Sequence, residues 1–560
     1  MAKYRSAEHL RKGENGLARS LYKSMGYSDD ELSGRPMIGI ANSWSTLVPG
    51  HSNLNQLADF VKKGIYRAGG TAAEFGVISA CDGIANGHEG MKYILPSREV
   101  ICNSIEIEAQ AHRLDGLVLL GSCDKIIPGM LMAAMRLNIP SILLAGGPML
   151  GGMVFDGRKT DATSNDEALG MFKAGFIKED VLEGLEDVTC PGCGSCAFFG
   201  TANTMGCLSE AMGMSMTGSA LVPAVWADRQ RYAYSSGRKI CELVEKGIKP
   251  RDIVTTAAMK NTIRTTMAVC GSTNAVLHLS AIAYEAELTD IDVVDAFEQL
   301  SKDTPQIAKV NPAAKWDMED FHRAGGIPRV MQNLSSLLDL SVMTCMGTTL
   351  KETLEQYSFR FEQNDEVIKT VDKPFSNTGG IAVLRGNLAP ETAITKPGAF
   401  AEHLQVFSGT ARVFDCEEDA NAAILSGVIK AGDVIVIRYE GPKGGPGMRE
   451  MYKAMKFLYG RGLHDTTALV TDGRFSGTNN GCFVGHISPE AAEGGPIALV
   501  QDGDVIEINV PAGTLTFNVS EETLAQRKAQ WKPVVKEIPR GYLRTYARLA
   551  ASANKGAVLL

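Results

Sequence analysis

The sequence predicts an α/β protein with a larger N-terminal domain, in which helices flank a parallel sheet, and a smaller β-rich, barrel-like C-terminal domain. In about the first 150 residues, short apolar segments alternate with helical ones, which is typical of a parallel sheet covered by helices. Beyond residue 380, short β-rich segments dominate. A chain of 560 residues is also too long for one hydrophobic core. We therefore expect domains at 1–370 and 371–560, joined near the polar segment 359–380.

The N-terminal domain is expected to contain four strands separated by helices. The apolar segments predict strands at 37–41, 75–80, 117–120 and 142–144. Helices are expected from Leu54 to the glycines at 69 and 70, at about 98–113 and at about 130–136, and residues 161–370 should be mostly helical. Polar residues follow several of the strands. Ligand crevices of open α/β sheets lie at the carboxyl ends of the strands, so these polar residues are candidates for one shared site.

The C-terminal domain is expected to be built from short strands, with helices near 417–429 and 449–461. The strand candidates are 381–385, 413–415, 433–439, 468–472, 497–501, 505–510 and 514–519.

Composition excludes several classes of protein. The hydrophobic share of 44%, charged share of 21% and net charge of −8 are those of a globular protein without a basic surface for nucleic acid or anionic membranes. The most apolar stretch, 139–155, is interrupted by prolines and glycines and makes a poor membrane span. The N-terminal residues lack the apolar core of a secretory signal, and 12 irregularly spaced cysteines do not resemble a disulfide framework. A cytoplasmic location is expected.

The tripeptide Cys123-Asp124-Lys125 is the first candidate for chemistry. It follows the apolar run of a predicted strand and presents a soft metal ligand, a hard metal ligand and an amine in succession. Asp82 follows another predicted strand and is an oxygen ligand of the kind that Mg²⁺ prefers. Each aspartate taken alone is more typical of a turn or a helix cap.

Three further cysteines, Cys190, Cys193 and Cys196, lie within seven residues. This spacing lets neighbouring sulfurs turn towards one metal ion or cluster. A structural zinc site needs four protein ligands, and the chain has no second pair of closely spaced cysteines to complete one. With Cys123 contributing from a distance, an iron–sulfur cluster with one open iron is favoured over a set of buried thiols. The remaining cysteines, taken singly, are interpreted as buried thiols: Cys81, Cys102, Cys207, Cys241, Cys270, Cys345, Cys416 and Cys482.

Two loops of the C-terminal half are also candidates. The glycine-rich loop 441–449 follows a predicted strand and opens a helix, so its backbone N–H groups are suited to an anion, and Glu450 is placed to add a third carboxylate to a metal. It lacks the spacing of a phosphate-binding P-loop. The second loop carries Arg474, a candidate bidentate partner for a substrate carboxylate, and Ser476 at a tight turn. Either loop alone is equally well interpreted as a connection.

Long blocks of this sequence resemble the dihydroxy-acid and phosphogluconate dehydratase family. They occur in order from the N-terminal region to beyond residue 500 and include PGHSNL, DGIANGHEGMKY, LPSRE, CDKIIPGMLMAAMRLNIPSI, RYEGPKGGPGMREM and TDGRFSGT. The resemblance implies a hydro-lyase that converts 2,3-dihydroxy-3-methylbutanoate and its methylpentanoate homologue to 2-oxo acids in valine and isoleucine synthesis. It also implies a homodimer that acts on a small molecule.

The resemblance implies a magnesium site and a catalytic base. The Mg²⁺ ligands of the family fall on Asp82, Asp124 and Glu450, and Lys125 matches a lysine that becomes carbamylated and binds the same ion. Ser476 matches the proposed base. A free serine is a very weak base, so Ser476 needs nearby positive charge to reach the alkoxide form.

The resemblance also places the cluster thiolates on Cys123 and Cys196. Family members with a [2Fe–2S] cluster have a third cysteine where this chain has Gly50. The third thiolate is therefore expected from Cys193, with Cys190 second, and an oxygen-sensitive [4Fe–4S] cluster is favoured over [2Fe–2S].

Three other functions remain open on the sequence. A sugar-acid dehydratase of the same family would act on an aldonate or on 6-phosphogluconate, and would need a more polar pocket or a phosphate site. An iron–sulfur electron carrier would need four thiolates and no open iron. A structural zinc protein would contain neither iron nor sulfide.

Overall fold

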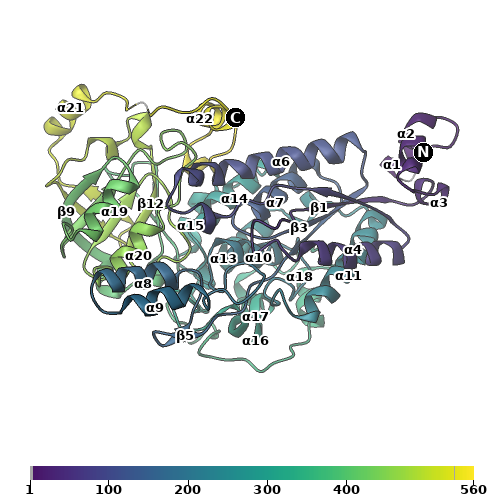
Figure 1. The fold of residues 1–560 in the computed structure, drawn as a ribbon, viewed down its shortest axis with the longest axis horizontal. Helices are drawn as coiled ribbons and strands as arrows, with labels where there is room; N and C mark the ends of the chain where they lie inside the picture. Colours follow the sequence, from purple (N-terminus) through teal and green to yellow (C-terminus); the bar gives the residue numbers. More distant parts are fainter. Residues whose placement is uncertain (1–3, 535) are drawn as a thin grey trace.

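The computed structural model describes residues 4–534 and 536–560 and contains two main sheets (Figure 1). The first sheet has four parallel strands in the order β2-β1-β3-β4. Their bounds are β1 Met37–Asn42, β2 Thr71–Gly76, β3 Gly116–Gly121 and β4 Ser141–Ala145. Every residue of β1, β3 and β4 is buried, as expected when helices cover both faces of a parallel sheet.

Helices cover both faces of the first sheet. Helices α4 (Leu54–Arg67) and α11 (Ala227–Lys246) pack together on one face, and α6 (Ile94–Ala111) and α7 (Ile126–Leu137) pack together on the other (Figure 1). The chain leaves β1 for β2 on one side and later returns past β1 to β3. This reversal creates a crevice at the carboxyl ends of β1 and β3, the place where such sheets bind ligands.

The rest of the N-terminal half is helical, as the sequence predicts. Small helices α1–α3 precede the sheet at Arg5–His9, Gly16–Ser24 and Asp29–Leu32. The helices after the sheet are α8 Ser164–Lys173, α9 Glu179–Glu186, α10 Thr201–Ala211, α12 Pro250–Ile253, α13 Thr256–Ala268, α14 Asn274–Glu285, α15 Val293–Leu300, α16 Met318–Arg323, α17 Gly326–Asn333 and α18 Leu350–Gln356.

The second sheet has eight strands in the order β14-β13-β9-β10-β11-β12-β8-β7. Strands β9 to β12 are parallel, and the outer pairs are antiparallel. The bounds are β7 Ala382–Leu384, β8 Thr392–Thr395, β9 Val406–Phe414, β10 Asp433–Ile437, β11 Ala468–Thr471, β12 Cys482–Ser488, β13 Val505–Asn509 and β14 Thr514–Phe517.

The second sheet closes on itself into a barrel. Next to β7, the Arg385 N–H donates to the Gly513 carbonyl at 2.9 Å, and the Leu515 N–H of β14 donates to the Arg385 carbonyl at 2.8 Å. Successive side chains of β10 point alternately to the inside and the outside of this barrel. Val434 and Val436 pack in its interior, whereas Ile435 and Ile437 pack under helices α19 (Glu417–Leu425) and α20 (Lys453–Gly460).

The α/β class and the barrel-like C-terminal sheet confirm the predicted fold class. Several element predictions were wrong in detail, and strands β8 and β12 were not predicted. The second strand lies at Thr71–Gly76 because these residues pair with β1, so the residues just before Asp82 form a loop. Residues 496–499 form a 3₁₀ turn instead of a strand, and α7 begins at Ile126, with Pro128 tolerated in its first turn. The domain boundary near residue 370 stays a prediction. None of the described helices is both long enough and apolar enough to span a membrane.

The two halves of the chain meet closely where α8 crosses α20. A Cβ atom added to Gly170 would lie 2.7 Å from the Gly460 Cα, so only glycine permits this approach of two backbones. Nearby, the buried Lys456 ammonium pairs with the Glu167 carboxylate at 2.9 Å. Because Glu450 lies just before α20, this contact helps to fix the position of one candidate ligand.

Gly170→Ala should destabilise the protein by about 1–3 kcal/mol, because the added methyl overlaps backbone that cannot turn aside. Gly184→Ala is the matched control, since Gly184 also lies in a helix but a Cβ there has open space. That control should stabilise the protein by roughly 0.5–1 kcal/mol. Thermal unfolding measures both, and an unchanged melting temperature for Gly170→Ala would contradict the close contact.

Candidate active site

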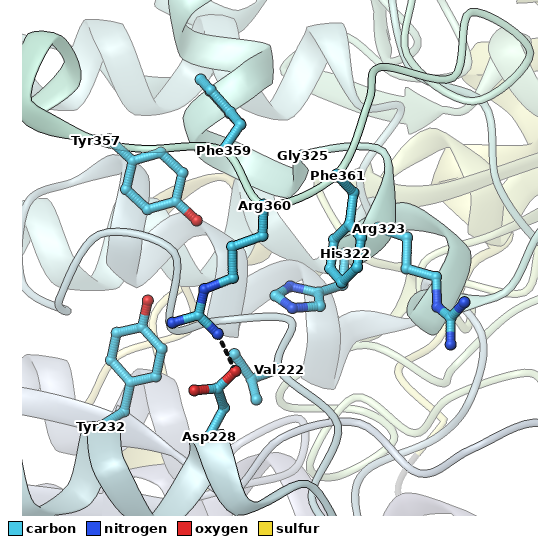
Figure 2. A pocket seen from close by; sticks show the side chains of 10 residues that line it. All are labelled: Val222, Asp228, Tyr232, His322, Arg323, Gly325, Tyr357, Phe359, Arg360 and Phe361. Carbon is cyan, nitrogen blue, oxygen red and sulfur yellow. Dashed lines mark hydrogen bonds and ion pairs between the residues drawn. The ribbon is translucent and has the colours of Figure 1, made fainter.

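A cavity of about 310 Å³ opens at the carboxyl ends of the first sheet and is walled by both halves of the chain. Asp82, Cys123 and Asp124 line it from the first sheet, and Glu450 and Ser476 line it from the loops of the barrel. Sequence positions more than 350 residues apart therefore share one space. A second cavity, between α11 and the segment that follows α18, has a volume of only about 20 Å³ and shares none of these residues (Figure 2). It holds little more than one water molecule.

Three carboxylates converge in the large cavity. One oxygen each from Asp82, Asp124 and Glu450 lies within 4.8 Å of the others. The Lys125 ammonium lies among them, at 2.8 Å from Asp82 Oδ2, 3.3 Å from Glu450 Oε2 and 3.6 Å from Asp124 Oδ2. The Arg474 guanidinium contacts Glu450 and lies 3.4 Å from Asp82. Two buried cations thus hold the three carboxylates together.

The carboxylates differ in their tendency to ionise. Burial, with the neighbouring Asp82 charge, raises the pKa of Asp124 to about 8. Burial also raises the pKa of Asp82. Although burial acts in the opposite direction, Lys125 and Arg474 lower the pKa of Glu450 to about 2. Buried carboxylates that repel one another favour a further cation among them.

The donor set fits a hard divalent cation. All three groups offer carboxylate oxygens, which Mg²⁺ prefers, and the spacing of the oxygens permits shared coordination. The Oδ1 atom of Asp82 is buried and has no hydrogen-bond partner among the described residues. Such an unpartnered oxygen is available to a metal ion.

A left-handed turn at the end of β3 separates the thiol of Cys123 from the carboxylate of Asp124. Cys123 has φ of 63°, a conformation that side-chain-bearing residues seldom adopt. Its thiol is directed to the side of Cys81 and Cys196, whereas Asp124 joins Asp82 and Glu450. The turn at Cys123 therefore places the cysteine side chains and the carboxylate triad next to each other in the cavity.

Four of the twelve cysteines line the cavity: Cys81, Cys123, Cys190 and Cys196. Cys193, the expected third ligand, is not among the residues that line it. Cys81, interpreted from sequence as a buried thiol, lines the cavity together with Cys123. The sequence placed Cys81 at the end of a strand, but it lies in the loop after β2, and no local pattern showed that it shares a cavity with Cys123.

Comparison with known proteins identifies the family. The N-terminal model of the dihydroxy-acid/6-phosphogluconate dehydratases matches residues 35–353, and the C-terminal model matches residues 366–557. The chain belongs to this family. A dihydroxy-acid dehydratase of Ruminiclostridium cellulolyticum is 50% identical over 554 residues, covering 98% of this chain and 99% of the relative. Dihydroxy-acid dehydratases of Pyrococcus furiosus and Methanosarcina barkeri are each 51% identical, over 98% of this chain and 99% and 98% of theirs. The protein is an enzyme of the hydro-lyase class.

Arg474 occupies a different position from the one expected of a substrate clamp in this dehydratase. It is fully buried behind Glu450, and its Nε donates to the Met448 carbonyl at 2.8 Å. Asn274, at the start of α14, also donates to Glu450 Oε2 at 3.3 Å and to the Phe475 carbonyl at 3.0 Å. Both residues orient Glu450, and no sequence pattern singled out Asn274.

Ser476 lines the cavity together with Glu450, and its side chain is one of the groups that help to lower the pKa of the Glu450 carboxyl. The next residue, Gly477, accepts a hydrogen bond at 3.1 Å from the ammonium of Lys396, a lysine that is almost fully buried. Burial lowers the pKa of Lys396. Lys396 therefore fixes the turn that carries Ser476, a role without any signal in the sequence.

The glycine-rich loop before Glu450 binds a carboxylate of the chain itself. The backbone N–H groups of Lys443 and Gly444 donate to Glu490 at 3.0 and 2.8 Å. The N–H groups that the sequence analysis considered suited to an anion thus bind a carboxyl group of the chain itself. Burial, with the charge of Asp472, raises the pKa of Glu490 to about 7.

Glu490→Gln should change how stability depends on pH. The folded pKa of about 7 exceeds the ordinary value of 4.5, so the favourable contribution of protonated Glu490 is complete below about pH 4.5 and is lost as pH rises through 7. Glutamine never ionises, so the variant should gain stability relative to the wild type between pH 5 and 8, on the order of 2–3 kcal/mol. Thermal unfolding across this range checks it.

Glu493→Gln is the control for that measurement, since Glu493 pairs with Lys443 at the surface. Its unfolding curve should run parallel to that of the wild type. Parallel curves for Glu490→Gln as well would contradict the raised pKa.

Proposed function

We propose that this enzyme dehydrates 2,3-dihydroxy-3-methylbutanoate and (2R,3R)-2,3-dihydroxy-3-methylpentanoate to 2-oxo acids, as valine and isoleucine synthesis requires. The observation that carries the proposal is the cavity in which a carboxylate triad adjoins several thiols. The named relatives support the substrate class, because they are dihydroxy-acid dehydratases over nearly their whole length.

The charges of the cavity favour this substrate over 6-phosphogluconate. Among the described residues that line it there is no lysine, arginine or histidine, so a phosphate dianion has no cationic partner in the wall. The lining also includes Val48, Ile84, Met91 and Phe198, which suit a short branched hydrocarbon chain.

We propose that Asp82, Asp124 and Glu450 hold Mg²⁺. The lining carries five carboxylates, with Asp161 and Asp166 in addition to the triad, so an anionic substrate needs a bound cation to enter. Carbamylation of Lys125 would replace its positive charge with a negative one and add an oxygen ligand. Carbamylation would therefore make the site more negative by about two charge units, and one bound Mg²⁺ would offset that change.

Cys123 and Cys196 are proposed to hold an iron–sulfur cluster, [4Fe–4S] in preference to [2Fe–2S]. When bound, the cluster supplies a Lewis acid for the departing C3 hydroxyl, and Mg²⁺ supplies positive charge for the substrate carboxylate. A cavity of about 310 Å³ beside the thiols also argues against an electron carrier, which needs no substrate space at its cluster.

Ser476 is proposed as the base that removes the C2 proton. Ser476 lines the cavity together with Glu450, one of the proposed Mg²⁺ ligands. The positive charge of a bound Mg²⁺ would favour the alkoxide form of Ser476. The proton passes from C2 to the Ser476 alkoxide, the C3–O bond breaks, and the departing hydroxide takes up one proton, which Ser476 can return, to leave as water. The resulting enol loses the proton on its C2 oxygen and gains one at C3, which gives the 2-oxo acid.

We further propose a cytoplasmic homodimer. All twelve cysteines are free of disulfides, which fits a reducing compartment. The dimer rests on the family resemblance, and light scattering of the purified enzyme tests it.

An assay of the anaerobically purified enzyme with both substrate classes tests the proposed reaction. We expect turnover of the two branched dihydroxy acids and little turnover of 6-phosphogluconate or of unphosphorylated aldonates. Turnover of the aldonates alone would overturn the assignment, and turnover of 6-phosphogluconate alone would show that the cavity wall is not what selects the substrate.

Ser476→Ala should lower kcat by about 10²–10⁴-fold, the usual contribution of a positioned base, while iron, sulfide and magnesium contents stay at wild-type levels. Thr478→Val is the matched control, because the Thr478 hydroxyl is buried without a hydrogen-bond partner and lies two residues away. The control should keep most of its activity. Equal activity of Ser476→Ala and wild type would remove Ser476 as the base.

A further inference from the structure

Cys81-Asp82 and Cys123-Asp124 form two equivalent dipeptides on either side of the first strand. Cys81 follows β2 and Cys123 follows β3, and both strands pair with β1. The two carboxylates meet in the triad with Glu450. The two cysteines also line one cavity, which Cys196 lines as well.

We infer that Cys81 is the third thiolate ligand of the iron–sulfur cluster, together with Cys123 and Cys196. This inference rests on the cluster of the proposed function and names a ligand that the sequence resemblance does not supply. Each cysteine sulfur turns about a single bond, so the thiols of Cys81 and Cys123, which line the same cavity, can turn towards one cluster. Cys81, Cys123 and Cys196 all line the cavity of about 310 Å³, so the three side chains share one space.

The other thiols are less suited to this role. Cys193 does not line the cavity, and Cys190 lines it but is exposed to solvent. Gly50 brings no ligand, although a Cβ added there would lie 2.9 Å from Cys123 Sγ. A cysteine at position 50 would therefore lie close to Cys123, but this chain has glycine there. Cys81 lines the same cavity and does carry a thiol.

The test is the iron and sulfide content of anaerobically purified Cys81→Ala, Cys190→Ala and Cys193→Ala, with EPR spectra after reduction. Mutation of a residue that only hydrogen-bonds to a metal ligand lowers metal affinity about tenfold or more. Loss of a ligand itself should cost at least as much, so we expect Cys81→Ala to retain about a tenth of the wild-type iron or less. Cys190→Ala and Cys193→Ala should retain wild-type iron and spectra. Wild-type iron in Cys81→Ala, or loss of iron in Cys190→Ala alone, would overturn the inference.

Two further measurements separate ligand loss from misfolding and from failure of the proposed function. The cluster-free forms of wild type and Cys81→Ala should unfold at similar temperatures, because the variant loses only a small thiol. The double variant Gly50→Cys/Cys81→Ala should regain iron, since it restores a thiol near Cys123. Absence of iron and sulfide from the wild type itself would refute the proposed cluster, and with it this ligand.

Discussion

The architecture depends on the convergence of three carboxylates on one small volume around the Lys125 ammonium. Two unit charges about 4 Å apart near a protein surface interact by about 4 kcal/mol, so the triad is stable only with cations among its members. Lys125 and Arg474 provide them from the first sheet and from the barrel. The same charges that hold the two halves together therefore prepare the position for a metal ion.

The sequence predicted the fold class because strand alternation and burial are local properties. The apolar run of β3 and the polar residues that follow it were visible as a pattern. The change from mostly helical segments to short β-rich segments near residue 380 was visible as well. The strand before Asp82 was placed too late, since the pairing that fixes β2 is with β1, far away in sequence. Local patterns contain no information on such pairing.

The candidate site was predicted unevenly for the same reason. Asp82, Asp124, Lys125 and Glu450 do lie together, as their places after predicted strands suggested, and the resemblance named them as one ligand set. Arg474 was recognised as a carboxylate partner, but its carboxylate belongs to Glu450 and not to a substrate. The contacts of Cys81, Asn274 and Lys396 join segments far apart in the chain, and only the folded structure displays them.

The closure of the barrel has a consequence for how this chain meets other chains. Strands β7 and β14 would be the free edges of an open sheet, but hydrogen bonds through Arg385 join them. An unpaired edge is a template for pairing with another chain, and in this barrel both edges are occupied. The barrel that carries the loops of Glu450 and Ser476 therefore presents no free strand edge between β7 and β14 to a second chain.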